Sequence, residues 1–109
     1  MTIPLKLMNE YCVDFPVWSA VGDTLGGRLP LSAELDARLR AWAAFFNAHH
    51  DWQTGWDVDR AEVQAHATEG RALQEALARE LGTGYSVTLD LWEVPRRGRL
   101  RALFDRSGR

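Results

Sequence analysis

The sequence predicts an α+β fold in which two helices pack on a small, mainly antiparallel sheet, in the order β-α-α-β-β. Two observations predict this class. Apolar and polar residues alternate near both ends of the chain, over residues 3–7 and 85–91, as they do in half-buried strands. Between these ends, residues 33–50 and 60–81 repeat apolar side chains every three or four positions, which is the period of a helix.

The composition favours one folded domain followed by a basic extension. The chain has 109 residues, of which 46% are hydrophobic and 26% charged, enough for a single core. We expect an α+β domain over residues 1–95 and an Arg-rich C-terminal extension over residues 96–109. The extension holds six arginines against Asp105, whereas residues 1–95 hold seven basic and fourteen acidic residues. An acidic domain with a basic extension can associate with a second copy of the chain, bind an acidic partner or contact nucleic acid.

The N-terminal strand is predicted from the alternation over residues 3–7. Residues 15–18 are also apolar, but Pro16 removes a backbone donor, so we expect an extended edge or a loop packed on the core. Residues 19–30 are predicted to form a loop. Their glycines have neither the spacing of a phosphate loop nor that of a dinucleotide-binding turn, which argues against a nucleotide site there.

The first helix is predicted to begin at Ala33, because Ser32 is a favourable N-cap residue. Its apolar stripe consists of Leu35, Leu39, Trp42, Phe46 and His49, and its last member is therefore an imidazole. We expect the helix to end near His49 or His50, and residues 51–57 to form a turn.

The second helix is predicted to begin near Arg60, with Asp57 or Asp59 as its cap, and to end at Gly82 in a left-handed conformation. Gly70 falls on its apolar stripe, although glycine is unfavourable inside a helix. We therefore expect another backbone to approach closely at Gly70, where the two helices or a helix and the sheet meet.

The C-terminal alternation over residues 85–91 is the clearest strand pattern in the chain, and we expect a central or well-packed strand. A weaker alternation over residues 99–104 favours a last strand within the extension.

Residues 42–57 hold three of the five tryptophans and two of the three histidines. Trp42 lies on the helical stripe and is expected in the core. Trp52 and Trp56 fall in a short polar turn, where they either close over the core or stay exposed as anchors for a partner. The candidate partner-binding residues are Trp52, Trp56, Asp51, Asp57 and His50.

The alternative site uses His49, His50 or His66 with a nearby aspartate, as in a small enzyme or a metal-binding protein. On a helix, His49 and His50 point about 100° apart and cannot chelate one metal together. We expect His49 to pack on the apolar stripe and His50 to stabilise the helix C-terminus, with no metal and no cofactor. Cys12 is expected to be a small buried hydrophobe, since no local signature marks it as a nucleophile.

No segment has the apolar length of a membrane span or a signal sequence, and a lone Cys12 cannot form an internal disulfide. We therefore expect a cytoplasmic protein with no membrane partner. Twelve arginines against one lysine indicate a GC-rich bacterial genome. Arginines of the extension could contact phosphates, which is the nucleic-acid alternative, but the net charge of −2 and the lack of a binding motif argue against it.

A set of short patterns runs from residue 8 to residue 93. They are Met-Asn-Glu-Tyr at 8–11, Leu-Pro-Leu-Ser at 29–32, Leu-x-x-x-Leu-x-x-Trp at 35–42, Trp-x-x-x-Trp at 52–56 and the strand at 85–93. In these patterns the chain resembles small uncharacterised bacterial single-domain proteins, a resemblance that implies no activity. We conclude from the sequence that the chain is a small module that binds a macromolecule, immunity-like or regulatory, with another protein or a second copy as its partner.

Overall fold

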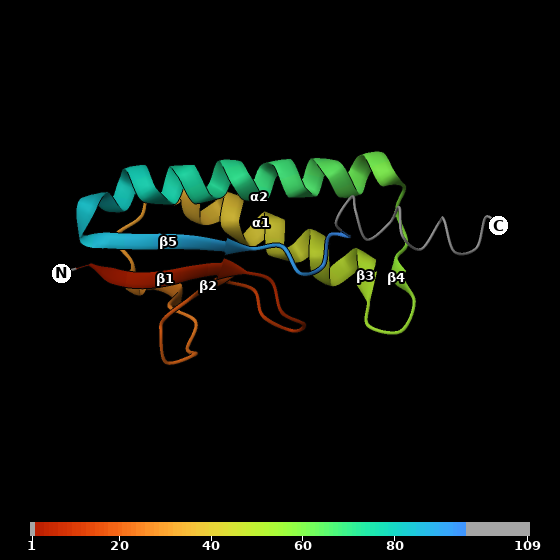
Figure 1. Ribbon diagram of the computed structural model, residues 1–109, viewed down its shortest axis with the longest axis horizontal. Helices are drawn as coiled ribbons and strands as arrows, with labels where there is room; N and C mark the ends of the chain where they lie inside the picture. The colour runs from red at the N-terminus through yellow and green to blue at the C-terminus, as the bar shows by residue number, and fades with distance from the viewer. Residues whose placement is uncertain (1, 96–109) are drawn as a thin grey trace.

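The computed structural model describes residues 2–95 of the chain (Figure 1). In chain order, the elements are β1 (Ile3–Met8), β2 (Val17–Trp18), a 3-10 turn (Gly26–Arg28), α1 (Ala33–His49), β3 (His50–Asp51), β4 (Gly55–Trp56), α2 (Arg60–Leu81), a second 3-10 turn (Gly82–Gly84) and β5 (Tyr85–Asp90). The arginine-rich extension and its predicted last strand lie outside the described residues.

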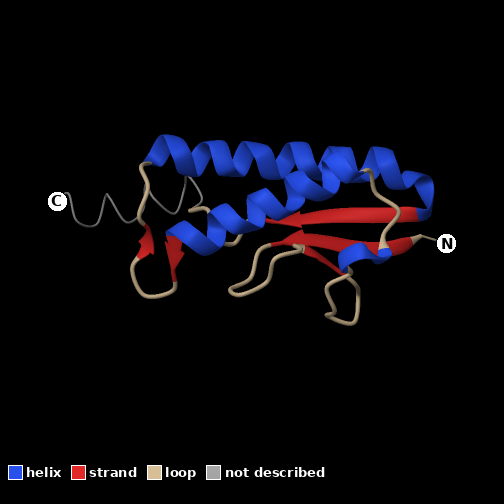
Figure 2. Ribbon diagram, turned by 180° about the vertical axis from the view of Figure 1, so that it is seen from behind, coloured by secondary structure: helices blue, strands red, loops and turns tan. Residues whose placement is uncertain are grey.

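Two helices pack on a three-stranded sheet, and β3 and β4 form a separate two-stranded ribbon at one end of the molecule (Figures 1 and 2). The α+β class is therefore confirmed. The core lies where β1, α1 and α2 meet, and its side chains include Leu7, Leu39 and Leu77, all 0% exposed. Neither helix among residues 2–95 has the length and apolar character to cross a membrane.

The expectation of a mainly antiparallel sheet is wrong. The strand order is β2-β1-β5, and β1 pairs with β5 in parallel from Ile3↔Tyr85 to Met8↔Asp90. Only the short pair β1–β2 is antiparallel. Parallel pairing requires a long crossover between the strands, which here contains both helices. The strand β5 is consequently an edge strand covered by α2, and β1 is the central strand.

The predicted helix ends are confirmed. Ser32 Oγ accepts a hydrogen bond from the backbone N–H of Leu35 at 3.1 Å, and Asp59 Oδ1 accepts one from Glu62 at 2.9 Å. Each bond satisfies a backbone donor that has no partner inside its own helix. Gly82 ends α2 with a positive φ of 78°, which glycine adopts without a side-chain penalty, but its ψ of −167° is not that of the predicted left-handed helical conformation.

Gly70 marks the contact of α2 with α1, but the group that approaches it is not a backbone. A Cβ placed on Gly70 would lie 2.8 Å from Cζ2 of Trp42 and 3.1 Å from Cδ2 of Leu91. The missing side chain therefore makes room for the Trp42 indole. Gly70 and Trp42 are both buried, so this contact belongs to the core.

Cys12 is exposed, contrary to the expected buried position. It occupies a turn with a φ of 66°, and its backbone N–H donates to Asn47 Oδ1 at 2.8 Å. The turn connects β1 to β2, so Cys12 faces solvent rather than the helices.

Candidate protein-binding surface

The ribbon that follows α1 is built by local turn chemistry. His50 pairs with Trp56 and Asp51 with Gly55 in antiparallel register. Asp51 Oδ1 accepts hydrogen bonds from the backbone N–H groups of Gln53 at 2.7 Å and Thr54 at 3.1 Å. These bonds hold the pKa of Asp51 below its ordinary value, because they favour the carboxylate form. The turn therefore carries a fixed negative charge.

The tryptophans of this chain divide into two kinds. Four of them donate the indole N–H to a backbone carbonyl oxygen at 2.8 Å, namely Trp18 to Met8, Trp42 to His66, Trp56 to Glu93 and Trp92 to Asn9. Trp52 makes no such bond within residues 2–95 and is 75% exposed at the tip of the ribbon. Four indoles are thus fixed to the fold by hydrogen bonds, and the fifth, that of Trp52, is exposed to solvent.

The sequence assigned Trp52 and Trp56 a shared role, and the structure separates them. Trp56 is half-buried and lies against Phe46 and His50, with ring centroids 6.2 Å and 4.9 Å away. It closes over the core, whereas Trp52 does not. Of the two side chains, only Trp52 offers its full ring to a partner.

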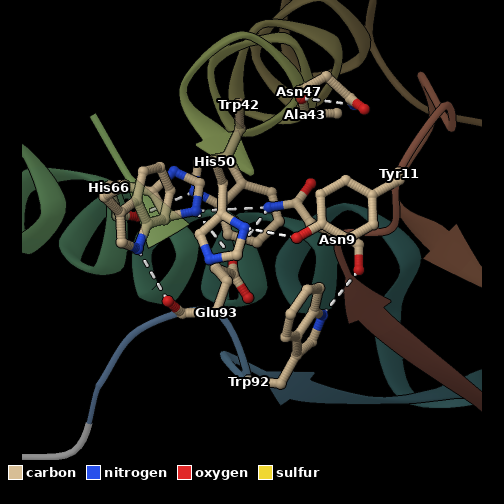
Figure 3. Close-up of polar contacts among 10 residues, drawn as sticks. Asn9, Tyr11, Trp42, Ala43, Asn47, His50, His66, Trp92 and Glu93 are labelled. Atoms are coloured by element: carbon tan, nitrogen blue, oxygen red, sulfur yellow. Dashed lines mark hydrogen bonds and ion pairs between the residues drawn. The ribbon is translucent and has the colours of Figure 1, made fainter. Parts of the chain in front are cut away.

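The roles expected for His49 and His50 are reversed. His50 lies inside an aromatic cluster formed by Tyr11, Phe46, Trp56 and Trp92. Its Nδ1 lies 2.6 Å from the hydroxyl oxygen of Tyr11, and its ring centroid lies 5.2 Å from that of Phe46 (Figure 3). His49 points outward, where its Nδ1 lies 2.9 Å from Asp57 Oδ1. The reason is that α1 ends at His49, and the extended backbone of His50 turns its side chain onto the core.

The Tyr11–His50 contact is a hydrogen bond to a neutral imidazole. Burial lowers the pKa of His50 from its ordinary value, against the opposing charges of Glu93 and Asp51. Burial also raises the pKa of Tyr11, with further contributions from the negative charges of Asp51, Glu10 and Glu93. The phenol therefore keeps its proton, and its hydroxyl is hydrogen-bonded to Nδ1 of the neutral ring.

Beneath this cluster lies a buried polar group of Asn9, His66 and Glu93, which are 1%, 4% and 3% exposed (Figure 3). Nε2 of His66 lies 2.8 Å from Oε2 of Glu93, and Nδ2 of Asn9 donates to the same oxygen at 3.0 Å. The group joins the end of β1, the middle of α2 and the segment after β5. It therefore fixes three distant parts of the chain to one another.

Sequence reasoning named His66 as a residue of the alternative site but missed Asn9 and Glu93. Asn9 follows β1, and Glu93 lies between Trp92 and Val94, so neither interrupts a periodic pattern. They are 84 residues apart, and no local signal could pair them. Their partnership depends on the parallel pairing of β1 with β5, which brings the carboxyl ends of both strands together.

The three histidines do not form one reactive site. His49 pairs with Asp57, His50 with Tyr11 and His66 with Glu93. The side chains of His66 and Glu93 are 1% and 0% exposed, so the buried pair is closed to a substrate in solvent. Within residues 2–95, no group of three histidine, cysteine or acidic side chains is arranged to hold a metal ion.

The segment that carries the exposed tryptophan also carries acidic side chains. Asp51 and Asp57 flank the turn of the ribbon in sequence and are exposed. Within the described residues, the ribbon thus presents an exposed indole together with two exposed carboxylates.

A family model described as Serratia CdiI immunity protein-like matches residues 3–90. The chain belongs to this family. The Serratia CdiI immunity protein-like match runs from the first residue of β1 to the last residue of β5, so it includes both helices and the ribbon. It overlaps most of the segment over which the chain resembles small bacterial proteins. No curated protein matches the chain.

Proposed function

We propose that this protein is an immunity module that binds a protein toxin and neutralises it by forming a complex. Membership of an immunity protein-like family supports a protein partner. The buried histidine–glutamate pair is enclosed, which favours a role in binding over one in chemistry. The expectation of a cytoplasmic bacterial protein is consistent with this role and stays a prediction.

We further propose that the partner binds at the ribbon, through Trp52, Asp51 and Asp57, with His50 and Trp56 supporting the ribbon from beneath. The observation that carries this proposal is the 75% exposure of Trp52. Tryptophan is among the residues that contribute most to protein interfaces, because its large ring loses water on binding at little entropic cost. The acidic residues around it favour a toxin with a basic surface.

A pull-down with three versions of the full chain tests this function. The wild-type protein, Trp52→Ala and Val21→Ala are immobilised and exposed to lysate of the source bacterium. Val21 is the matched control, because it is 83% exposed in a loop between β2 and α1. We expect a protein retained by the wild type and by Val21→Ala but lost from Trp52→Ala.

The captured protein is then expressed alone and together with this chain. We expect growth arrest in the first case and normal growth in the second. A protein that is captured equally by all three baits, or that is harmless when expressed alone, would contradict the proposal.

A further inference from the structure

A groove of about 340 Å³ lies between α1 and α2, beside the ribbon. Phe45 is the accessible aromatic ring of its lining, and the rings of Trp42 and His66 lie almost fully buried behind it. Ala41 and Ala65 leave the space open because their side chains are short. The helices separate toward the C-terminal end of α1, where this groove lies (Figure 2). Its volume is at the low end for ligand sites, which suits one inserted side chain rather than a large cofactor.

The groove lies close to residues that support the ribbon. Phe45 lines it and also lies next to two residues of the ribbon end, with ring centroids 4.7 Å from His49 and 6.0 Å from Trp56. His49 in turn pairs with Asp57. Phe45 is therefore shared between the groove and the packing that supports the ribbon.

The rim of the groove is acidic. Glu62 and Glu69 both line it, and Arg38 is the one basic residue among its lining side chains within the described part of the chain. Arg38 is already engaged, since its Nε and Nη2 donate to the two carboxylate oxygens of Glu69 at 3.2 Å each. The charge of Glu34 also acts on Arg38. Glu62 is thus left to attract an incoming cation.

The aromatic lining of the groove also favours a cationic side chain. A guanidinium or ammonium group is attracted to the face of an aromatic ring when it lies within about 6 Å of the centroid. The chain already uses this contact elsewhere, because the guanidinium carbon of Arg40 lies 5.0 Å from the ring centroid of Phe15. Phe45 is half-buried, so part of its ring is accessible from the groove.

We infer that the groove accepts a single arginine or lysine side chain of the toxin, with its apolar stem against Phe45 and Trp42 and its charged head beside Glu62. This inference rests on the proposed function, because it names the chemistry of the same partner. An acidic partner side chain would be repelled by the rim, and a neutral apolar one would leave Glu62 without a partner.

The direct test uses the full chain and three small probes, the acetylated and amidated derivatives of arginine, norleucine and glutamate. Binding is followed by NMR at the indole N–H of Trp42 and the backbone amide of Ala65. We expect saturable shifts with the arginine derivative, with a dissociation constant in about the millimolar range. Norleucine should bind at least about threefold more weakly, and the glutamate derivative should not bind.

Two variants and one control variant test whether the arginine derivative binds in the groove. Ala65→Leu fills the groove from an exposed helical position and should abolish the shift of the Trp42 indole with the arginine derivative. Ala44→Leu is the matched control, because Ala44 is exposed on α1 and lies outside the groove lining. Glu62→Gln should weaken arginine binding about twofold to fivefold and leave norleucine binding unchanged. Persistent binding to Ala65→Leu, tighter binding of norleucine or glutamate, or no binding of arginine would overturn the inference.

The captured toxin gives a second test that separates the two proposals. Ala65→Leu should weaken its binding at least about tenfold, whereas Ala44→Leu should not change it. If the toxin binds Ala65→Leu as tightly as wild type but loses Trp52→Ala, the groove inference fails and the proposed function stands. If no toxin depends on Trp52, the proposed function fails, and the probe titration alone decides what the groove accepts.

Discussion

The ring of Trp42 stacks on the ring of His66, with centroids 4.8 Å apart and planes inclined by 9°. The indole N–H of Trp42 also donates to the backbone oxygen of His66 at 2.8 Å. The imidazole is therefore held on one side by α1 and on the other by Glu93, at 2.8 Å from Nε2. Through this arrangement the contact between the helices also positions the buried polar group of Asn9, His66 and Glu93.

The first prediction concerns the buried partner of His66. Glu93→Ala removes the acceptor that both His66 and Asn9 use, leaving two buried polar side chains without it. We expect the free energy of unfolding, measured by urea denaturation, to fall by about 3 kcal/mol. The matched control is Asp57→Ala at the exposed His49 pair, which should cost less than about 1 kcal/mol. Equal losses from the two variants would contradict this account of the buried group.

The second prediction concerns the contact between the helices. Gly70→Ala gains about 1 kcal/mol of helix propensity but places a Cβ against an indole that a hydrogen bond and a ring stack hold in position. We expect a net loss of about 1 to 2 kcal/mol in the free energy of unfolding. Gly84→Ala should change it by less than about 0.5 kcal/mol, since its added Cβ meets nothing within 4 Å. A stabilised Gly70→Ala variant would show that Trp42 moves freely.

The third prediction concerns pH. The pKa of His50 is lowered by burial from the value of 6.5 that it has in an unfolded chain, while Glu93 and Asp51 oppose this shift and His66 adds to it. Between the folded and unfolded pKa values the unfolded chain binds more protons. The contribution of His50 to stability is therefore complete above about pH 6.5 and declines as the pH falls toward the folded pKa.

An NMR titration of the His50 ring checks this direction. Its midpoint in the folded protein should lie below the midpoint in the urea-unfolded chain. Tyr11→Phe removes the hydroxyl that is hydrogen-bonded to Nδ1, and the direction in which the midpoint moves identifies the donor: upward if the phenol donates to the ring, downward if the ring donates to the phenol. A midpoint in the folded wild type equal to or above that of the unfolded chain would refute the assignment of a neutral His50.

The sequence was most informative where structure is decided locally. The caps at Ser32 and Asp59 and the positive φ at Gly82 depend on a few neighbouring residues, and all three were predicted. The pairing direction of β1 and β5 was not, because it depends on how the connection between them packs. Periodicity is the same in parallel and antiparallel strands.

The candidate site, too, could be predicted only where its residues are close together in the sequence. Its exposed half, the ribbon with Trp52, lies in one short segment and could be recognised by composition. Its buried half joins Asn9 to Glu93 across 84 residues and gave no local signal. The exchange of roles between His49 and His50 followed from one residue at a helix end, because α1 ends at His49 and His50 already has extended backbone.

The central claim is that Trp52 serves a partner and not the fold. Calorimetric titration of the captured toxin with wild type, Trp52→Ala and Val21→Ala, together with urea denaturation of each, tests it most directly. We predict that Trp52→Ala weakens binding by at least about 2 kcal/mol, or roughly thirtyfold, while its free energy of unfolding stays within about 0.5 kcal/mol of wild type and Val21→Ala changes neither. Wild-type affinity in Trp52→Ala, or a loss of affinity explained by an equal loss of stability, would contradict the claim.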